Sequence, residues 1–296
     1  MRWLPLILLV GCAAAPPDPV DPTPTPDEGP APCSLWNAPR VTGTVDSGEL
    51  DEISGIVVGR EQPDRLYVIE DSGAAAEVWA LTVDGDVADR YVLNGADNVD
   101  WEDLTMAPCG DGWCLWLADV GDNAAARDEV VLYRIEEPEP GALVVDAIAH
   151  RGRYPDGAHD VEGVAWAGDE LLAFTKRTGN RTEVFAWSDL TPEGVHEAEL
   201  RAEVDTDSGD GVATLGVTAA DITDEGDRLL LRGYFDLRWW DLGEDLTLDV
   251  ADSTAVPFVP EGQGEAAAWD PHRRGVWTVG ESPGGRPPLH FTPCAN

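Results

Sequence analysis

The sequence predicts an all-β protein, a five-bladed β-propeller, because a three-part pattern recurs along the chain from Ser54 onward. The aromatic residues that mark the third part in four copies are Trp79, Tyr133, Phe185 and Trp240, which lie 54, 52 and 55 residues apart. Helical periodicity is absent, and short apolar segments alternate with turns that contain Gly and Asp. A period near fifty with this pattern is typical of propeller blades.

The first two parts of each copy are predicted to be apolar strands. The first strand opens on a small or acidic residue, and we expect it at 54–57, 102–104, 162–165, 220–222 and 265–268. The second strand ends at a polar turn, and we expect it at 66–69, 115–118, 171–174, 229–231 and 276–279. In the fifth copy the third part, around His290 and Phe291, is degenerate.

The fifth copy ends at the C-terminus with only three strands, so the ring needs an outer strand from elsewhere. The segment 40–45, RVTGTV, is predicted to supply it from the N-terminal side of the repeats. This closure would leave no open edge on the last blade. The alternative is six blades, which would require a further blade between Ala198 and Gly216.

Four cysteines in the predicted propeller domain, 33–296, predict two disulfides. Cys109 and Cys114 flank the turn 110–113, GDGW, and can close it between two strands. Cys33 and Cys294 lie at the two ends of the predicted domain, and their pairing would lock the seam of the ring. An even number of cysteines in an exported chain favours disulfides. A zinc site is the alternative, but no His lies at ligand spacing to these cysteines.

The N-terminal segment 1–12 is predicted to be an export signal. Its apolar run is too short to span a bilayer of roughly 30 Å. The tetrapeptide LVGC, ending at Cys12, resembles the bacterial lipobox, in which the cysteine is lipidated and becomes the mature N-terminus. The alternative is an ordinary signal peptide that is cut after Ala13 to Ala15.

We therefore expect three segments and a location in the cell envelope. Residues 1–12 are the lipoprotein signal, the Pro- and Asp-rich stretch 13–32 is a stiff tether, and 33–296 is the propeller domain. The protein is expected to be a monomer that is lipid-anchored at the outer membrane or cell surface, with the membrane itself as its first partner.

The charge balance excludes most nucleic-acid-binding proteins. The chain has 57 Asp and Glu against 19 Lys and Arg, a formal net charge of −38. A protein that neutralises phosphates needs a cationic face, which this chain lacks. Hydrophobic residues make up 43% of the sequence, enough for a core, so disorder is excluded for most of the chain.

The antiparallel connectivity predicts where polar residues gather. The loop before the first strand and the loop after the second strand must lie at the same end of each blade. Carboxylates at one channel mouth repel one another unless protons or a bound cation compensate. Hard oxygen ligands on Gly-containing loops favour Ca²⁺. The candidate metal ligands are Glu52, Asp71, Asp100, Glu102, Asp119, Asp122, Asn123, Asp160, Glu162 and Glu265.

Four residues on the same face are candidate catalytic groups. Lys176 and Arg177 bring positive charge, either as structural ion pairs or to hold an anionic substrate. His159 or Glu162 is the candidate general base, although a lone His is also common as a hydrogen-bonded loop residue. No G-x-S-x-G or H-E-x-x-H motif occurs, so serine and zincin hydrolase chemistry has no sequence support.

Three ordered motifs carry a family resemblance. The runs DWEDL at 100–104, DVGDN at 119–123 and YPDGAHDVE at 154–162 resemble those of a largely uncharacterised family of exported bacterial β-propeller proteins. The wider group is similar to phytase-like and esterase-like propellers, whose metal sites lie at the channel mouth. The resemblance covers roughly Glu52 to Lys176 and transfers no activity, since a fold does not determine a function.

Three functional hypotheses follow. The first is an envelope-anchored lipoprotein whose acidic channel mouth holds Ca²⁺ and presents it to a small ligand or an envelope protein. The second is a metal-dependent hydrolase of phosphate esters or lactones. In it Ca²⁺ polarises the substrate, His159 or Glu162 acts as base, and Lys176 or Arg177 holds the anion. The third is a structural propeller with a solvated acidic mouth.

Overall fold

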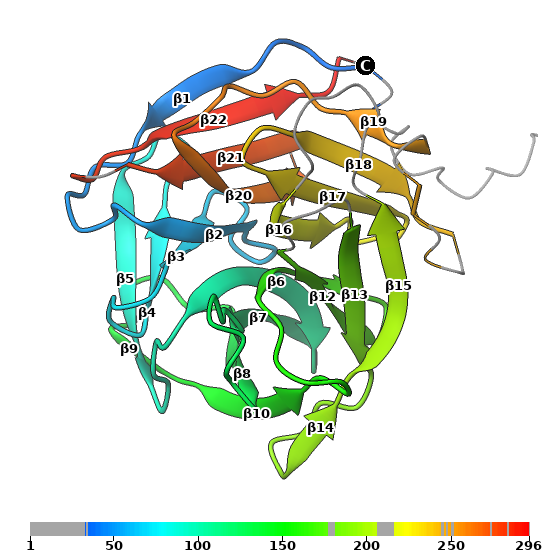
Figure 1. Ribbon diagram of the computed structural model, residues 1–296. Coiled ribbons are helices and arrows are strands. Elements are labelled where there is room, and N and C mark those ends of the chain that lie inside the picture. The colour runs from blue at the N-terminus through cyan, green and yellow to red at the C-terminus, as the bar shows by residue number, and fades with distance from the viewer. Residues whose placement is uncertain are drawn as a thin grey trace, which may run out of the picture. The chain divides into compact units, whose positions relative to one another are not determined.

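The computed structural model describes residues 33, 35–176, 181–205, 216–243, 246, 248–249, 252–272, 274–282 and 284–295. The strands form five separate, mainly antiparallel sheets, which are the five blades of a β-propeller (Figure 1). This confirms the predicted fold class and the count of five blades. The described residues contain no helix that is long and apolar enough to cross a membrane.

Blades 1 and 2 contain five strands each. Blade 1 comprises β2 (Ile53–Val58), β3 (Leu66–Glu70), β4 (Glu77–Leu81), β5 (Val87–Asn94) and β9 (Val144–Asp146). Blade 2 comprises β6 (Trp101–Cys109), β7 (Gly112–Asp119), β8 (Val130–Glu136), β10 (Ile148–Arg153) and β14 (Val195–Glu197). The last strand of each blade is a short segment that pairs in parallel with the strand before it.

Blades 3 to 5 contain four strands each. Blade 3 comprises β11 (Val161–Ala167), β12 (Glu170–Thr175), β13 (Arg181–Trp187) and β15 (Glu199–Asp205). Blade 4 comprises β16 (Val217–Ile222), β17 (Arg228–Gly233), β18 (Leu237–Asp241) and β19 (Thr254–Ala255). Blade 5 comprises β20 (Gln263–Asp270), β21 (Gly275–Glu281), β22 (Pro288–Pro293) and β1 (Arg40–Thr44).

The first strand of every blade lies nearest the centre, and neighbouring first strands touch. Contacts join β2 to β6, β6 to β11, β11 to β16, β16 to β20, and β20 back to β2, so the ring is closed. Strands β2 and β16 are buried at every position, because blades cover both of their faces. This explains why most of their residues are apolar or small on both faces.

Large aromatic rings fill the space between blades. Trp79 and Trp277 belong to one buried cluster with residues of blades 1 and 5, and Trp116 and Trp187 belong to a cluster of blades 2 and 3. Trp240 is buried against the apolar residues of blades 3 and 4. Burying rings of this size contributes heavily to the stability of the interfaces between blades.

The N-terminal strand closes the last blade. β1 pairs antiparallel with β22, with Arg40 opposite Phe291 and Thr44 opposite Pro288. The disulfide between Cys33 and Cys294 joins the two ends of the domain beside this seam, with the Cα atoms 5.2 Å apart. A second disulfide spans the β6–β7 turn and links Cys109 to Cys114. The predicted closure and both predicted disulfides are confirmed.

Two short strands tie neighbouring blades together in a way that the repeat pattern did not reveal. β9 follows the third strand of blade 2 in the chain, yet it pairs with β5 of blade 1. β14 follows the third strand of blade 3 and pairs with β10 of blade 2. Each exchange covers the outer edge of one blade with a segment of the next, which protects that edge from pairing with other chains.

A β-bulge recurs at the same place in all five first strands. In each blade the register between the first and second strands shifts by one residue close to the start of the first strand. The residues skipped by the pairing are Ser54, Glu102, Glu162, Thr218 and Glu265. Bulges of this kind re-aim a side chain and are common beside functional sites. Three of the five re-aimed residues are glutamates.

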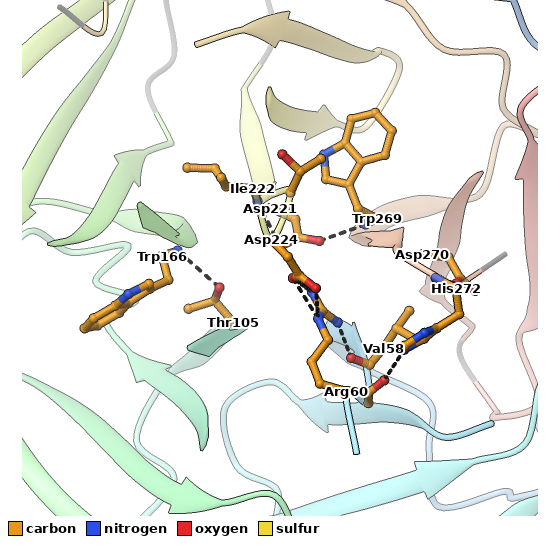
Figure 2. A network of polar contacts seen from close by, with 12 residues as sticks. Val58, Arg60, Thr105, Trp166, Asp221, Ile222, Asp224, Trp269, Asp270 and His272 are labelled. Carbon is orange, nitrogen blue, oxygen red and sulfur yellow. Dashed lines mark hydrogen bonds and ion pairs between the residues drawn. The ribbon is translucent and has the colours of Figure 1, made fainter. Parts of the chain in front are cut away.

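Buried aspartates join the first strands of different blades. The Asp103 carboxylate accepts hydrogen bonds from the backbone N–H groups of Val164 on β11 and Ala220 on β16, at 2.9 and 3.1 Å. The carboxylate of Asp221 on β16 accepts one from Trp269 on β20, at 2.8 Å (Figure 2). These bonds satisfy backbone donors along the centre of the ring that would otherwise have no partner.

An ion pair crosses the ring at the end where the first and second strands are joined by turns. Arg60 follows β2 and Asp224 follows β16, and their side chains pair with Nη2 and Oδ1 2.7 Å apart (Figure 2). His272, after β20, lies with Nε2 3.0 Å from the carbonyl oxygen of Gly59. Side chains of blades 1, 4 and 5 thus meet at this end of the ring.

Candidate metal centre at the channel mouth

At the opposite end of the ring, the loop before the first strand lies against the loop after the second strand in blades 1, 2 and 3. Asp71 N–H donates to the carbonyl oxygen of Glu52 at 2.9 Å, and Lys176 N–H donates to that of Asp160 at 2.9 Å. In blade 2, Gly121 N–H donates to the Asp100 carbonyl at 3.1 Å. These bonds hold the polar loops of blades 1, 2 and 3 in equivalent positions.

Five carboxylates meet at this end in two overlapping groups. One oxygen each from Asp71, Asp100 and Glu102 lies within 4.8 Å of the other two, and the same holds for Glu102, Asp160 and Glu162. Asp71 follows β3, Asp100 precedes β6, and Asp160 precedes β11. Glu102 and Glu162 are bulge residues of β6 and β11. The site therefore draws on blades 1, 2 and 3.

Glu102 stands at the centre because it belongs to both groups. Its side chain is buried, with the residue 5% exposed, and no described residue donates a hydrogen bond to its carboxylate. Burial raises the pKa of Glu102 to about 11, and the charges of Glu162, Asp71 and Asp100 add to the effect. A buried carboxylate without a partner stays ionised only when a cation compensates its charge.

A glycine makes room for this crowding. A Cβ atom at Gly121 would overlap Oε1 of Glu102 and would lie 2.7 Å from Oδ2 of Asp100. Any other residue at this position would push the two carboxylates apart. The glycine of the DVGDN run is therefore required by the close approach of side chains from the neighbouring loop.

Lys176 lies at the edge of the second group. Its Nζ is 2.7 Å from Oε1 of Glu162 and 5.2 Å from the ring centre of Tyr234. Burial alone would lower the pKa of Lys176, but the Glu162 carboxylate raises it above its ordinary value. Burial raises the pKa of Glu162 to about 7, so the ion pair offsets only part of the effect of burial.

Asp119, Asp122 and Asn123 lie outside the two groups. The side chain of Asp119 pairs with Arg127, with Nη1 and Oδ1 2.8 Å apart. Asp122 accepts the backbone N–H groups of Ala126 and Arg127 at 2.7 and 2.6 Å. Asn123 is exposed. Asp119 and Asp122 therefore shape the loop after β7.

Glu52 and Glu265 flank the two groups. Glu265 accepts a hydrogen bond from the Tyr234 hydroxyl at 3.1 Å and shares a hydrogen bond with Glu281. Burial and this bond raise the pKa of Glu281 to about 8, so the Glu265 and Glu281 carboxyls retain a proton near neutral pH. Burial, with the charges of neighbouring acids, also raises the pKa of Glu52.

His159 contacts residues outside the two carboxylate groups. Its Nε2 lies 2.7 Å from Oδ1 of Asp156, and its Nδ1 lies 3.4 Å from Oε2 of Glu183. Its ring packs against Tyr154 and Phe185. Both ring nitrogens therefore face carboxylates other than those of the two groups, and the role of general base stays a prediction. Arg177 and Cys12 lie outside the described residues.

Sequence reasoning missed two kinds of residue. Asp103 and Asp221 are buried acceptors for backbone groups, and an acid inside an otherwise apolar strand was the available signal. Tyr234 lies in the loop after β17, which is equivalent to the loop that carries Lys176, and its contacts depend on two neighbouring blades.

A groove of about 820 Å³ lies elsewhere and is lined by the β6–β7 turn and the end of β8. Trp113 and Arg134 are among its walls, and none of the five grouped carboxylates lines it. Its volume is large enough for a small ligand. The carboxylate groups, however, carry the unusual charge arrangement, so they form the candidate site.

Comparisons with known proteins support the fold. No family model matches the chain, and no curated protein matches it. The PQQ-bound form of aldose sugar dehydrogenase from Streptomyces coelicolor matches with a TM-score of 0.51 and 13% identity, over 88% of this chain and 100% of that one. The β-propeller domain of Cps50 (Swd1) from Myceliophteria thermophila matches with a TM-score of 0.41 and 16% identity, over 85% and 99%. At 13% identity the first likeness shows the β-propeller fold alone.

Proposed function

We propose that the protein binds a divalent cation, Ca²⁺, at the channel mouth and presents it to a small ligand or an envelope protein. The observation that carries this proposal is the Glu102 carboxylate, which is buried, without a described hydrogen-bond donor, and shared by two groups of acids. A cation is the partner that such a group lacks.

The donor set favours Ca²⁺ among the common metals. Every member of the two groups offers carboxylate oxygen, and neither group contains His or Cys. Hard oxygen ligands suit Ca²⁺, Mg²⁺ and Mn²⁺, whereas Zn²⁺ and Cu²⁺ prefer nitrogen and sulfur. Ca²⁺ accepts six to eight oxygens in irregular geometry, which suits side chains delivered by three separate blades.

The location is part of the proposal. The LVGC run at Cys12 supports lipid anchoring in the bacterial envelope, and two disulfides in the described domain fit an oxidising compartment. Labelling with a radioactive fatty acid tests the anchor. Wild-type protein should incorporate the label and Cys12→Ser should not, whereas label in both proteins would contradict the assignment.

Calorimetric titration and thermal melting after chelation test the cation. When the free Ca²⁺ concentration is one hundred times the Kd, binding adds about 2.7 kcal/mol to the free energy of unfolding. Ca²⁺ should therefore raise Tm by several degrees. Glu102→Gln should abolish the titration heat and the rise, yet leave the Tm of the chelated protein unchanged, because Glu102 is protonated there. Glu203→Gln, at an exposed pair with Arg181, is the control and should behave as wild type. The absence of any titration heat with millimolar Ca²⁺ would contradict the proposal that the protein binds Ca²⁺.

A second candidate function is the metal-dependent hydrolysis of phosphate esters or lactones. The observation that favours it is the pair of Glu162 and Lys176 beside the proposed cation. A carboxylate whose pKa is about 7 can accept a proton near neutral pH, and an ammonium group can hold an anion. Turnover of an ester, lactone and phosphoester panel should stop with chelator and in Glu162→Gln, and persist in His159→Gln. If no compound of the panel is turned over, the hydrolase function is contradicted and only the binding function remains.

A further inference from the structure

The two carboxylate groups are distinct in composition but share one member. Asp71 and Asp100 lie with Glu102 on one side, and Asp160 and Glu162 lie with it on the other. Glu102 has two carboxylate oxygens, and it is 5% exposed with no described donor to either of them. A carboxylate in this position can place one oxygen on each of two ions, as happens in sites that hold a pair of metals.

The charges near Glu102 also point to two ions. The five grouped carboxylates carry five negative charges when ionised, and Lys176 brings one positive charge through its pair with Glu162. Arg127 does not change this balance, because it pairs with the carboxylate of Asp119, which is outside the groups. Among the described residues the remaining charge is −4, which two divalent cations would balance. A single cation would leave −2 in a half-buried site, which low-dielectric surroundings disfavour.

We propose that the channel mouth holds two divalent cations bridged by the Glu102 carboxylate, the first with Asp71 and Asp100 and the second with Asp160 and Glu162. This inference rests on the proposed function and goes beyond it in the number of ions and in the bridging residue. The proposal also gives the bulge at Glu102 a role. The bulge takes this side chain out of the β6–β7 pairing and places it between the loops of blades 1 and 3.

The two positions differ in one respect that sets the order of filling. Lys176 occupies Oε1 of Glu162, so a cation in the second position competes with an ammonium group for that carboxylate. Among the described residues, no Lys or Arg side chain pairs with Asp71, Asp100 or Glu102. The first position therefore binds more tightly than the second.

Metal stoichiometry measured by equilibrium dialysis against Ca²⁺, on chelator-treated full-length protein, tests the inference. Wild type should bind two ions per chain in two steps. Asp100→Asn should lose the tight step and keep one ion, and Asp160→Asn should lose the weak step and keep one ion. Lys176→Met removes the competing ammonium group and should tighten the weak step at least tenfold. Glu203→Gln serves as the matched surface control.

The outcomes separate the inference from the function on which it rests. Two ions in wild type, with a different step lost in each aspartate variant, support the bridged pair. One ion in wild type, or loss of the same step in both variants, overturns the bridged pair and leaves the proposed function standing. No bound ion overturns both. Circular dichroism and thermal melting in chelator identify any variant that fails to fold, and Asp71→Asn and Glu162→Gln then replace Asp100→Asn and Asp160→Asn.

Discussion

Nδ1 of His290 lies 2.7 Å from Oε1 of Glu261, and both side chains are buried in the interface between blades 4 and 5. The other carboxylate oxygen of Glu261 pairs with Arg232 of β17, whose side chain is 1% exposed. Burial alone would raise the pKa of Glu261, but Arg232 and His290 together hold it below its ordinary value. One carboxylate therefore neutralises a buried guanidinium and joins two blades.

Removing that carboxylate should destabilise the whole ring. We expect Glu261→Ala to lower the free energy of unfolding by about 3–5 kcal/mol, because Arg232 would remain buried without a counter-charge. Glu203→Ala, at the exposed pair with Arg181, should cost less than about 1 kcal/mol. Urea unfolding measures both. Similar losses of unfolding free energy in the two variants would show that the buried pair stabilises the protein no more than the exposed pair does.

The protonation of Asp221 should make stability depend on pH. Burial raises the pKa of Asp221 to about 7, with the Arg60 charge opposing the shift (Figure 2). The folded state thus binds this proton more tightly than the unfolded chain, where the pKa of Asp is about 3.9. Its stabilising contribution is complete below about pH 4 and is lost as pH rises toward 7.

The measurement compares wild type with Asp221→Asn by urea unfolding from pH 4 to pH 8. The free energy of unfolding of wild type should fall relative to the variant, by about 1 kcal/mol per pH unit between pH 4 and pH 7, and then level off. A difference that stays constant over this range would mean that Asp221 does not titrate there. The paired comparison cancels the other acids, which titrate in both proteins.

The two disulfides should differ in their effect on stability. Cys33 and Cys294 close a loop with a sequence separation of 261, whereas Cys109 and Cys114 are separated by 5. On the chain-entropy account, the first disulfide destabilises the unfolded chain by about 5.5 kcal/mol and the second by about 2 kcal/mol. Urea unfolding of the two double Cys→Ser variants tests this order. A larger loss from the Cys109→Ser/Cys114→Ser variant would contradict it.

Much of the fold was readable from sequence because its signals are local and repeated. Each blade is one supersecondary unit, so the apolar strands and the aromatic spacing of Trp79, Tyr133 and Phe185 recur at one period. The closure of blade 5 by β1 followed from a missing strand. The pairings of β9 and β14 with the preceding blade did not follow, because three-residue segments carry no periodic signal.

The sequence by itself determined the ring, the seam and the end of the blades where acids would gather. Only the tertiary structure decided which acids meet. Asp100 and Asp119 look alike in sequence, since each stands in an acidic loop beside a strand of blade 2. Asp119 is neutralised by Arg127 of its own loop, whereas Asp100 reaches Asp71 of blade 1. That outcome depends on distances between blades, on the Glu102 bulge and on the space left by Gly121, and none of these is a local property of the chain.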